Sequence, residues 1–302
     1  MAFYRCEARI IGREKRGRSV VAAAAYRAGT KLRDELRDKV YDYARRLKGV
    51  IDSTILSPAD APEWTHDPEQ LWNSVERQEK RKDAQLAREF ILAVPPELSA
   101  DAQFQTAVDW ARQELVAKGM IAEVSLHHSK TGNNPHVHIL CTMRKLDGEK
   151  FSPKKATEWN DVALLVQQRE SWANAVNAAL EKAGRPERVD HRSLKERGID
   201  REPEPKIGVA ATAMKRRGVL LDPERFKLVR HVRLMNEVMP LLKSIRTTGQ
   251  LPMWKIQPTW WTKPTTFLSQ FCMRAAERLK GSWRKLVTAQ KSKQPDEPDR
   301  ER

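Results

Sequence analysis

The feature that most constrains the fold is a pair of strand-like segments joined by a short loop rich in Gly, Asn and Pro. Residues 121–128 read IAEVSLHH and residues 136–143 read HVHILCTM, with the seven residues SKTGNNP between them. Short runs rich in Val, Ile and Leu that are bounded by turn residues favour β-strands. A loop this short most simply joins neighbouring strands, so we expect a β-hairpin here.

Other segments predict further strands and helices around this hairpin. Residues 3–10 alternate between apolar and charged side chains, as a half-buried strand does, and residues 87–94 form a second strand-like run that Pro95 and Pro96 end. Residues 30–48 are dominated by charges. From periodicity and capping residues such as Ser19, Ser99 and Thr157, we expect helices over residues 20–28, 69–86, 99–119 and 157–183.

Four of the seven histidines fall between positions 127 and 138. His136 and His138 are two residues apart, so they share one face of a strand, with Cβ atoms about 6–7 Å apart. If residue 128 pairs with residue 136, His128 joins them across the hairpin at about 5 Å. In that register His127 and Cys141 point to the other face.

Three imidazoles that converge from two adjacent strands can hold a divalent cation and leave other coordination positions open. An open-sided site is typical of catalytic metals rather than structural ones. Imidazole ligands suit Zn, Mn, Ni or Co, and the residues alone do not choose among them. The alternative is that these histidines are ordinary polar strand residues.

Tyr26 is the second residue of interest, because it stands after four alanines in SVVAAAAYRAG. That pattern by itself indicates a core aromatic ring packed over small side chains. Its context changes the interpretation, since several separated blocks between residues 1 and 210 together resemble the MobA/MobL relaxases of mobilisable plasmids, members of the HUH endonucleases. These blocks are SVVAAAAYRAG, LWNSVERQEKRKDAQLAREFILAVP, HSKTGNNPHVH and DHRSLKERGIDREPEPKIG.

The resemblance implies an α+β fold, with a central antiparallel β-sheet flanked by helices and then a basic, mostly helical C-terminal region. It implies that Tyr26 attacks DNA and that a cation, Mg or Mn, is bound by the triad His128, His136 and His138. It also implies that Glu89 supports the metal site, where the alternative is a strand glutamate that faces solvent. Lys206 departs from the resemblance, since relatives often have histidine there.

The charge of the chain favours a polyanionic partner. The net charge is +16, and residues 203–302 contribute 21 basic and 9 acidic residues, a net of +12. The basic side chains nearest Tyr26 could hold DNA phosphates, although a solvated surface loop explains most of them equally well. The candidates are Arg13, Lys15, Arg16, Arg18 and Arg27, with Arg192 and Lys195 further along, and Arg27 could also ease proton loss from Tyr26.

We expect a relaxase domain over residues 1–205 and a basic helical region over residues 206–302 that ends in a disordered tail. Residues 251–287 mix tryptophan with lysine and arginine, a composition that could stack on single-stranded bases, lie on a membrane surface, or dock a partner such as a secretion coupling protein. The alternative is a small helical subdomain that buries its tryptophans. No Walker motif, signal peptide or membrane-length apolar run is present, and three scattered cysteines suit a reducing bacterial cytoplasm.

The function expected is a mobilisation relaxase that nicks one DNA strand at a transfer origin, forms a 5′-phosphotyrosine and later rejoins the strand. Its partners would be single-stranded or locally melted DNA, accessory mobilisation proteins and the coupling protein, and it would be cytoplasmic and could be transferred with the DNA. Two alternatives stay open. A rolling-circle initiator or HUH transposase would use the same chemistry, although a tyrosine that precedes the histidines favours a relaxase, and a basic DNA-binding protein would have no catalysis at all.

Overall fold

The computed structural model describes residues 4–13, 19–44, 49–128, 134–205, 207–218 and 223–248. By its internal contacts the chain divides into two compact units, Met1–His191 and Arg192–Arg302. The limit at residue 205 that we expect from the sequence therefore lies inside the second unit.

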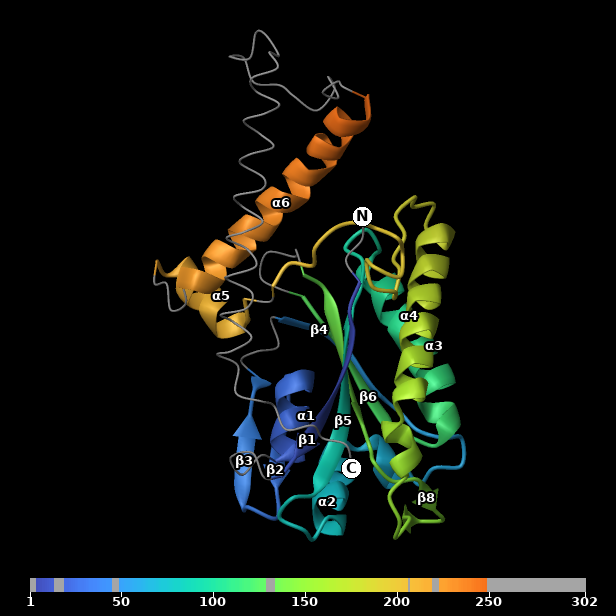
Figure 1. Cartoon of the computed structure of the whole chain (residues 1–302). Coiled ribbons are helices and arrows are strands. Elements are labelled where there is room, and N and C mark those ends of the chain that lie inside the picture. The colour runs from blue at the N-terminus through green and yellow to red at the C-terminus, as the bar shows by residue number, and fades with distance from the viewer. Residues whose placement is uncertain are drawn as a thin grey trace. The chain divides into compact units, whose positions relative to one another are not determined.

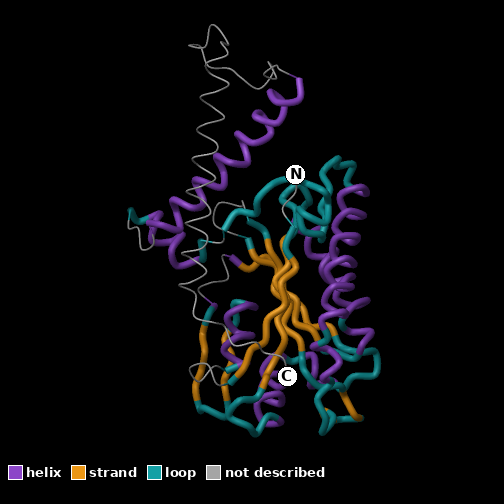
Figure 2. Tube along the Cα trace, in the orientation of Figure 1, coloured by secondary structure: helices purple, strands orange, loops and turns teal. Residues whose placement is uncertain are grey.

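The first unit is built on a five-stranded sheet in which every neighbouring pair of strands is antiparallel. Figure 2 shows this sheet as a strongly twisted set of strands. The predicted hairpin is confirmed, since its two strands pair directly. In spatial order the strands are β1 (Cys6–Gly12), β5 (Gln85–Ala93), β7 (His136–Cys141), β6 (Ala122–His127) and β4 (Val50–Leu56).

Two long helices, α3 (Ala100–Glu114) and α4 (Val162–Lys182), lie along one face of the sheet (Figure 1). This face is apolar because every second residue of the inner strands is large and hydrophobic, as Val124 and Leu126 are in β6. The ring of Trp110 packs edge-on against Phe90 of β5 and Trp172 of α4, with centroids 5.7 and 5.6 Å apart. These contacts form the main hydrophobic core.

The opposite face of the sheet is covered by α1 (Val20–Ala28) and α2 (Pro68–Gln78). Both predicted signals that bound α1 are confirmed. The Ser19 hydroxyl accepts a hydrogen bond from the amide of Ala22, and Gly29 ends the helix with φ 65°, a left-handed conformation that suits glycine. The Ala-rich stretch allows α1 to pack closely, so that Ala24 and Ala25 are fully buried.

Several elements differ from the sequence prediction. The charged segment 30–48 contains a hairpin, β2 (Lys31–Asp34) with β3 (Lys39–Asp42), and the edge strand β4 follows it. The predicted helix 69–86 ends at Gln78 instead, and the long helix α4 starts after Asp161, which caps it, rather than after Thr157. The short elements that complete the unit are η2 (Glu63–His66), η3 (Val116–Lys118), β8 (Leu146–Asp147), β9 (Lys150–Phe151) and η4 (Thr157–Asn160).

The second unit contains two helices among its described residues, α5 (Val209–Arg216) and α6 (Pro223–Thr248). They agree with the predicted helical character of this region. The tryptophan-rich segment 251–287 and the predicted disordered tail lie outside the described residues. In the described part of the chain, no helix combines the length and the apolar character that crossing a membrane requires.

Candidate active site

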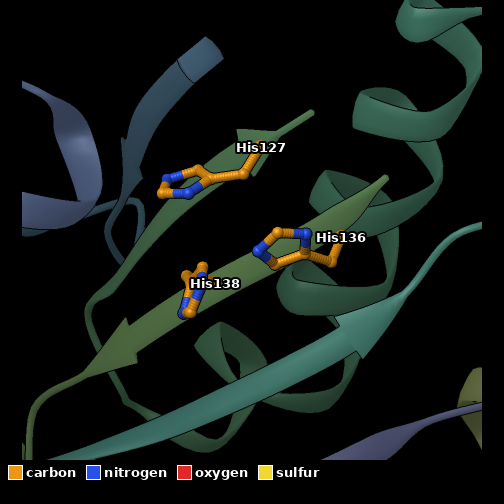
Figure 3. A group of neighbouring side chains, drawn as sticks. All are labelled: His127, His136 and His138. Carbon is orange, nitrogen blue, oxygen red and sulfur yellow. The ribbon is translucent and has the colours of Figure 1, made fainter. Parts of the chain in front are cut away.

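Three histidines converge on the face of the sheet that α1 covers. His127 is the last residue of β6, and His136 and His138 stand on the neighbouring strand β7 (Figure 3). One ring nitrogen of each lies within 4.8 Å of the others. Three imidazole nitrogens this close, on two rigid paired strands, could bind one divalent cation.

The predicted pairing of residue 128 with residue 136 is wrong by one position. His127 is the residue opposite His136, and Ser125 is opposite His138. Because strand side chains alternate, a shift of one residue moves each of them to the other face. His128 therefore lies on the α3 side, where its Nε2 is 2.8 Å from the side-chain oxygen of Gln103.

The sequence did contain the signal for the correct face. In IAEVSLHH, Val124 and Leu126 belong to the hydrophobic core, so the residues between them face the other way. His128 shares the face of Leu126, whereas His127 continues the polar row that starts with Glu123 and Ser125. The alternation of apolar residues along β6 therefore predicts the face of each histidine better than an assumed pairing of residues 128 and 136 across the loop does.

Each histidine of the cluster donates a hydrogen bond through one ring nitrogen. His136 Nδ1 donates to the main-chain oxygen of Asn134 at 2.9 Å, and His138 Nδ1 donates to Glu89 Oε1 at 2.6 Å. His127 Nε2 donates to the main-chain oxygen of Arg27 at 2.6 Å. These bonds leave the second nitrogen of each ring for a cation, which is how protein-bound metals usually have their histidines oriented.

Burial keeps two of these histidines in the neutral form that binds metals. It lowers the pKa of His127 to about 4 and also lowers the pKa of His136. A neutral imidazole has a lone pair for coordination, and a protonated one does not. Two rings of the cluster, those of His127 and His136, are therefore neutral at pH 7 and can coordinate a cation.

Glu89 is buried beside the cluster, so the alternative of a solvent-facing strand glutamate is wrong. Burial alone would raise its pKa, but hydrogen bonds from His138 and Arg27, with the charge of Arg27, outweigh burial and hold the pKa at about 2. A carboxylate behind a ligand histidine orients the ring and makes it a stronger ligand. Glu89 is placed for that role.

Tyr26 lies on the side of α1 that is not buried in the core, with 41% of its surface exposed. Its ring packs edge-on against Tyr43, with centroids 5.4 Å apart. It directly precedes Arg27, whose carbonyl accepts the hydrogen bond from His127. The histidine cluster is thus hydrogen-bonded to the main chain of α1 at Arg27, the residue that follows the nucleophile candidate.

The basic candidates have different environments. Arg13 is 16% exposed and pairs with the fully buried Glu76, which makes it part of the fold, and Arg27 pairs with Glu89. Lys15, Arg16 and Arg18 lie outside the described residues. Arg192 and Lys195 are exposed and belong to the second unit.

A second buried carboxylate, absent from the residues expected at the site, lies on the same face as the histidines. Glu123 of β6 accepts a hydrogen bond from Trp72 Nε1 of α2 at 2.7 Å. Burial raises its pKa to about 7, against the ordinary 4.5. A charged residue within the otherwise apolar run IAEV is the signal that could have found it.

Glu123→Gln is expected to remove a pH dependence of folding stability. A carboxyl whose pKa is raised by folding contributes stability below pH 4.5, and that contribution is lost as the pH rises through about 7. A pKa change of this size corresponds to roughly 3 kcal/mol. Glutamine keeps an oxygen for Trp72, so urea unfolding at pH 5 and pH 8 should show the variant gaining stability over the native chain at pH 8.

Glu158→Gln is the matched control, because Glu158 is exposed on the surface of the same unit. Its curve should follow that of the native chain between pH 5 and pH 8. If the Glu123→Gln curve also runs parallel to the native one, then Glu123 ionises as easily in the folded chain as in the unfolded one, and the expected effect is absent.

An antiparallel sheet that presents three converging imidazoles, backed by a buried carboxylate, defines a protein with a candidate divalent-metal site. Comparison with known proteins gives its family. The model of the MobA/MobL family matches residues 18–217, and the chain belongs to that family.

Individual relatives are consistent with this assignment. The chain is 34% identical to the conjugal transfer protein TraA of Rhizobium radiobacter over 76% of its length, and 34% identical to the mobilization protein MobL of Acidithiobacillus ferridurans over 72%. The matches cover 24% of TraA and 65% of MobL, so the chain spans only part of these relatives.

One solved structure has a clearly similar fold. It is described as "Molecular Basis of Vancomycin Resistance Transfer in Staphylococcus aureus" and is 32% identical, with a TM-score of 0.60. The similarity covers 64% of this chain and 100% of that one.

Proposed function

We propose that this chain is a relaxase that nicks one DNA strand at a plasmid transfer origin and later rejoins it. The observation that carries the proposal is the hydrogen bond from His127 to the main-chain oxygen of Arg27, the residue next to Tyr26 in α1. An exposed tyrosine on a helix whose last turn is hydrogen-bonded to a cluster of three imidazoles suits phosphodiester chemistry. The names of the relatives, conjugal transfer and mobilization proteins, support it.

The residues of the cluster fit a divalent cation, and we propose Mg or Mn because the family resemblance implies one of these two. Three ring nitrogens within 4.8 Å of one another, two lowered histidine pKa values and the buried carboxylate of Glu89 support this fit. When bound, such a cation supplies Lewis-acid stabilisation of the negative charge on the phosphate. His127, His136 and His138 would hold it, with Glu89 behind His138. His128, the ligand expected from the sequence, is replaced by His127 in this proposal.

The chemical step would be a transesterification by Tyr26. Its phenol oxygen forms a bond to phosphorus as the phenol proton leaves, the bond from phosphorus to the DNA 3′-oxygen breaks, and that oxygen gains a proton. The products are a 5′-phosphotyrosine and a 3′-hydroxyl. Because one phosphoester replaces another, the reverse reaction can rejoin the strand. The DNA must be single-stranded or locally melted for its backbone to reach Tyr26.

We also propose the broader setting that the sequence suggests. Residues 1–205 would form the nicking domain, and the basic residues 206–302 would add affinity for DNA or for a partner such as the coupling protein of a secretion channel. Lys15, Arg16 and Arg18 remain proposed phosphate contacts, with Arg192 and Lys195 as further candidates. Accessory mobilisation proteins would act with the chain in the bacterial cytoplasm, from which it could travel with the DNA.

The test mixes the full chain with a single-stranded oligonucleotide that carries the transfer origin of its own plasmid. With Mn²⁺ or Mg²⁺, we expect a protein–DNA adduct that survives denaturation, and a chelator should prevent it. Oligonucleotide binding without any adduct, under all of these conditions, would instead support the basic DNA-binding protein without catalysis.

A further inference from the structure

Arg27, in the last turn of α1, contacts several groups of the protein at the candidate site, which a residue that only binds DNA would not need to do. Its Nε donates to Glu89 Oε1 at 2.7 Å, and its Nη1 donates to the main-chain oxygen of Ala23 at 2.7 Å. Its own carbonyl accepts the hydrogen bond from His127 at 2.6 Å. The side chain is only 14% exposed.

We propose that Arg27 is a positioning residue that fixes the helix of Tyr26 to the histidine cluster. This inference rests on the proposed function and adds to it a residue that aligns the nucleophile with the cation. The contacts of Arg27 with the cluster form two branches. The carbonyl of Arg27 holds His127, and its guanidinium holds Glu89, which in turn holds His138.

The two branches act on different parts of the site. Glu89 Oε1 accepts from both Arg27 and His138, so the charge of Arg27 keeps this carboxylate in place for the histidine. Removing Arg27 leaves a buried carboxylate with one partner fewer, which costs free energy and loosens the ring of His138. The carbonyl branch is a main-chain contact, so it depends on where α1 ends rather than on the side chain.

The same contacts argue against Arg27 as a phosphate ligand. Two of its guanidinium nitrogens already donate to protein oxygens. A phosphate that accepted the hydrogen bond of Nε would leave the buried carboxylate of Glu89 without its arginine partner. A helix of nine residues has little stability of its own, so its end needs tertiary contacts to stay aligned. The planar guanidinium can reach Glu89 and Ala23 together, whereas a lysine ammonium is a single point of charge.

The test compares Arg27→Gln and Arg27→Lys with the native chain in three measurements. These are the affinity for Mn²⁺ without DNA by titration calorimetry, the single-turnover rate of adduct formation, and the affinity for the origin oligonucleotide in chelator. We expect Arg27→Gln to weaken Mn²⁺ binding by about 10- to 100-fold, as loss of support behind a metal ligand does. The rate of adduct formation should fall together with Mn²⁺ affinity, while the affinity for the oligonucleotide in chelator should stay unchanged. Arg27→Lys should recover part of the lost Mn²⁺ affinity.

Arg77→Gln is the matched control, since Arg77 lies in the last turn of α2 and pairs with Glu35 on the surface. It should bind Mn²⁺ as the native chain does. If Arg27→Gln folds poorly, the double variant Arg27→Gln/Glu89→Gln is compared with Glu89→Gln alone. The double variant no longer carries a buried, unpaired carboxylate, so its Mn²⁺ affinity can still test the proposal. The proposal expects the double variant to bind Mn²⁺ no more weakly than Glu89→Gln alone.

Two results would overturn the inference. One is an unchanged Mn²⁺ affinity in Arg27→Gln, and the other is a loss of oligonucleotide affinity in chelator as large as the loss of adduct rate, which would make Arg27 a DNA contact. A failure of the proposed function is distinguishable from both. In that case the native chain forms no adduct, while the Mn²⁺ titrations still report whether Arg27 supports the cluster.

Discussion

Tyr26→Phe is expected to abolish the covalent adduct between the chain and its origin oligonucleotide. The substitution removes the one oxygen that would form the bond to phosphorus, and loss of a catalytic nucleophile lowers turnover by about 10⁴-fold or more. Tyr26 is 41% exposed, so the substitution should change the free energy of unfolding by less than about 1 kcal/mol. Denaturing electrophoresis of the reaction with Mn²⁺ measures the adduct, and thermal unfolding checks the fold.

Tyr43→Phe is the matched control, because Tyr43 is the aromatic neighbour of Tyr26 and belongs to the loop after β3. Phenylalanine keeps a ring against Tyr26, and the adduct should form as in the native chain. An adduct that survives Tyr26→Phe but disappears in Tyr43→Phe would show that the nucleophile was assigned to the wrong one of two adjacent tyrosines.

The parts of the fold that the sequence predicts are those set by local interactions. Ser19 and Gly29 bound α1 through contacts within the same turn, and the alternation of apolar residues marks the inner strands. The edge strand β4 gives a weaker pattern, since most of its residues are only half-buried or exposed. The hairpin of β2 and β3 is hidden by charges, which pair within the hairpin, as Arg33 does with Asp38, or with α2, as Glu35 does with Arg77.

The parts of the site that the sequence does not predict depend on contacts far apart in the chain. Arg27 and Glu89 are 62 residues apart, and Arg13 and Glu76 are 63 apart, so neither ion pair can be recognised from spacing. From the sequence both arginines are therefore candidates for DNA contacts, whereas in the structure both pair with buried carboxylates. The family resemblance identified the residue types of the site, but the fold decides which histidine and which arginine face it.

The difference between His127 and His128 gives the second large expected effect. His127→Ala should weaken Mn²⁺ binding by about 100-fold or more and slow adduct formation, because a residue that binds the metal directly contributes at least as much affinity as the groups that orient it. His128→Ala should keep Mn²⁺ affinity and adduct rate, because His128 faces α3 and contacts Gln103. Titration calorimetry with Mn²⁺, followed by single-turnover reactions on the same preparations, measures both.

These two variants control for each other, since they delete the same side chain at adjacent positions. His128→Ala removes one hydrogen bond to Gln103, which still donates to the carbonyls of Pro95 and Leu98, so a loss of about 1 kcal/mol in stability is expected without loss of metal. The opposite result, in which His128→Ala loses the metal and His127→Ala keeps it, would mean that the active chain pairs β6 and β7 one residue out of the register seen here. Because one residue inverts a strand's faces, that result would also move Glu123 and Ser125 from the side of α1 to the side of α3.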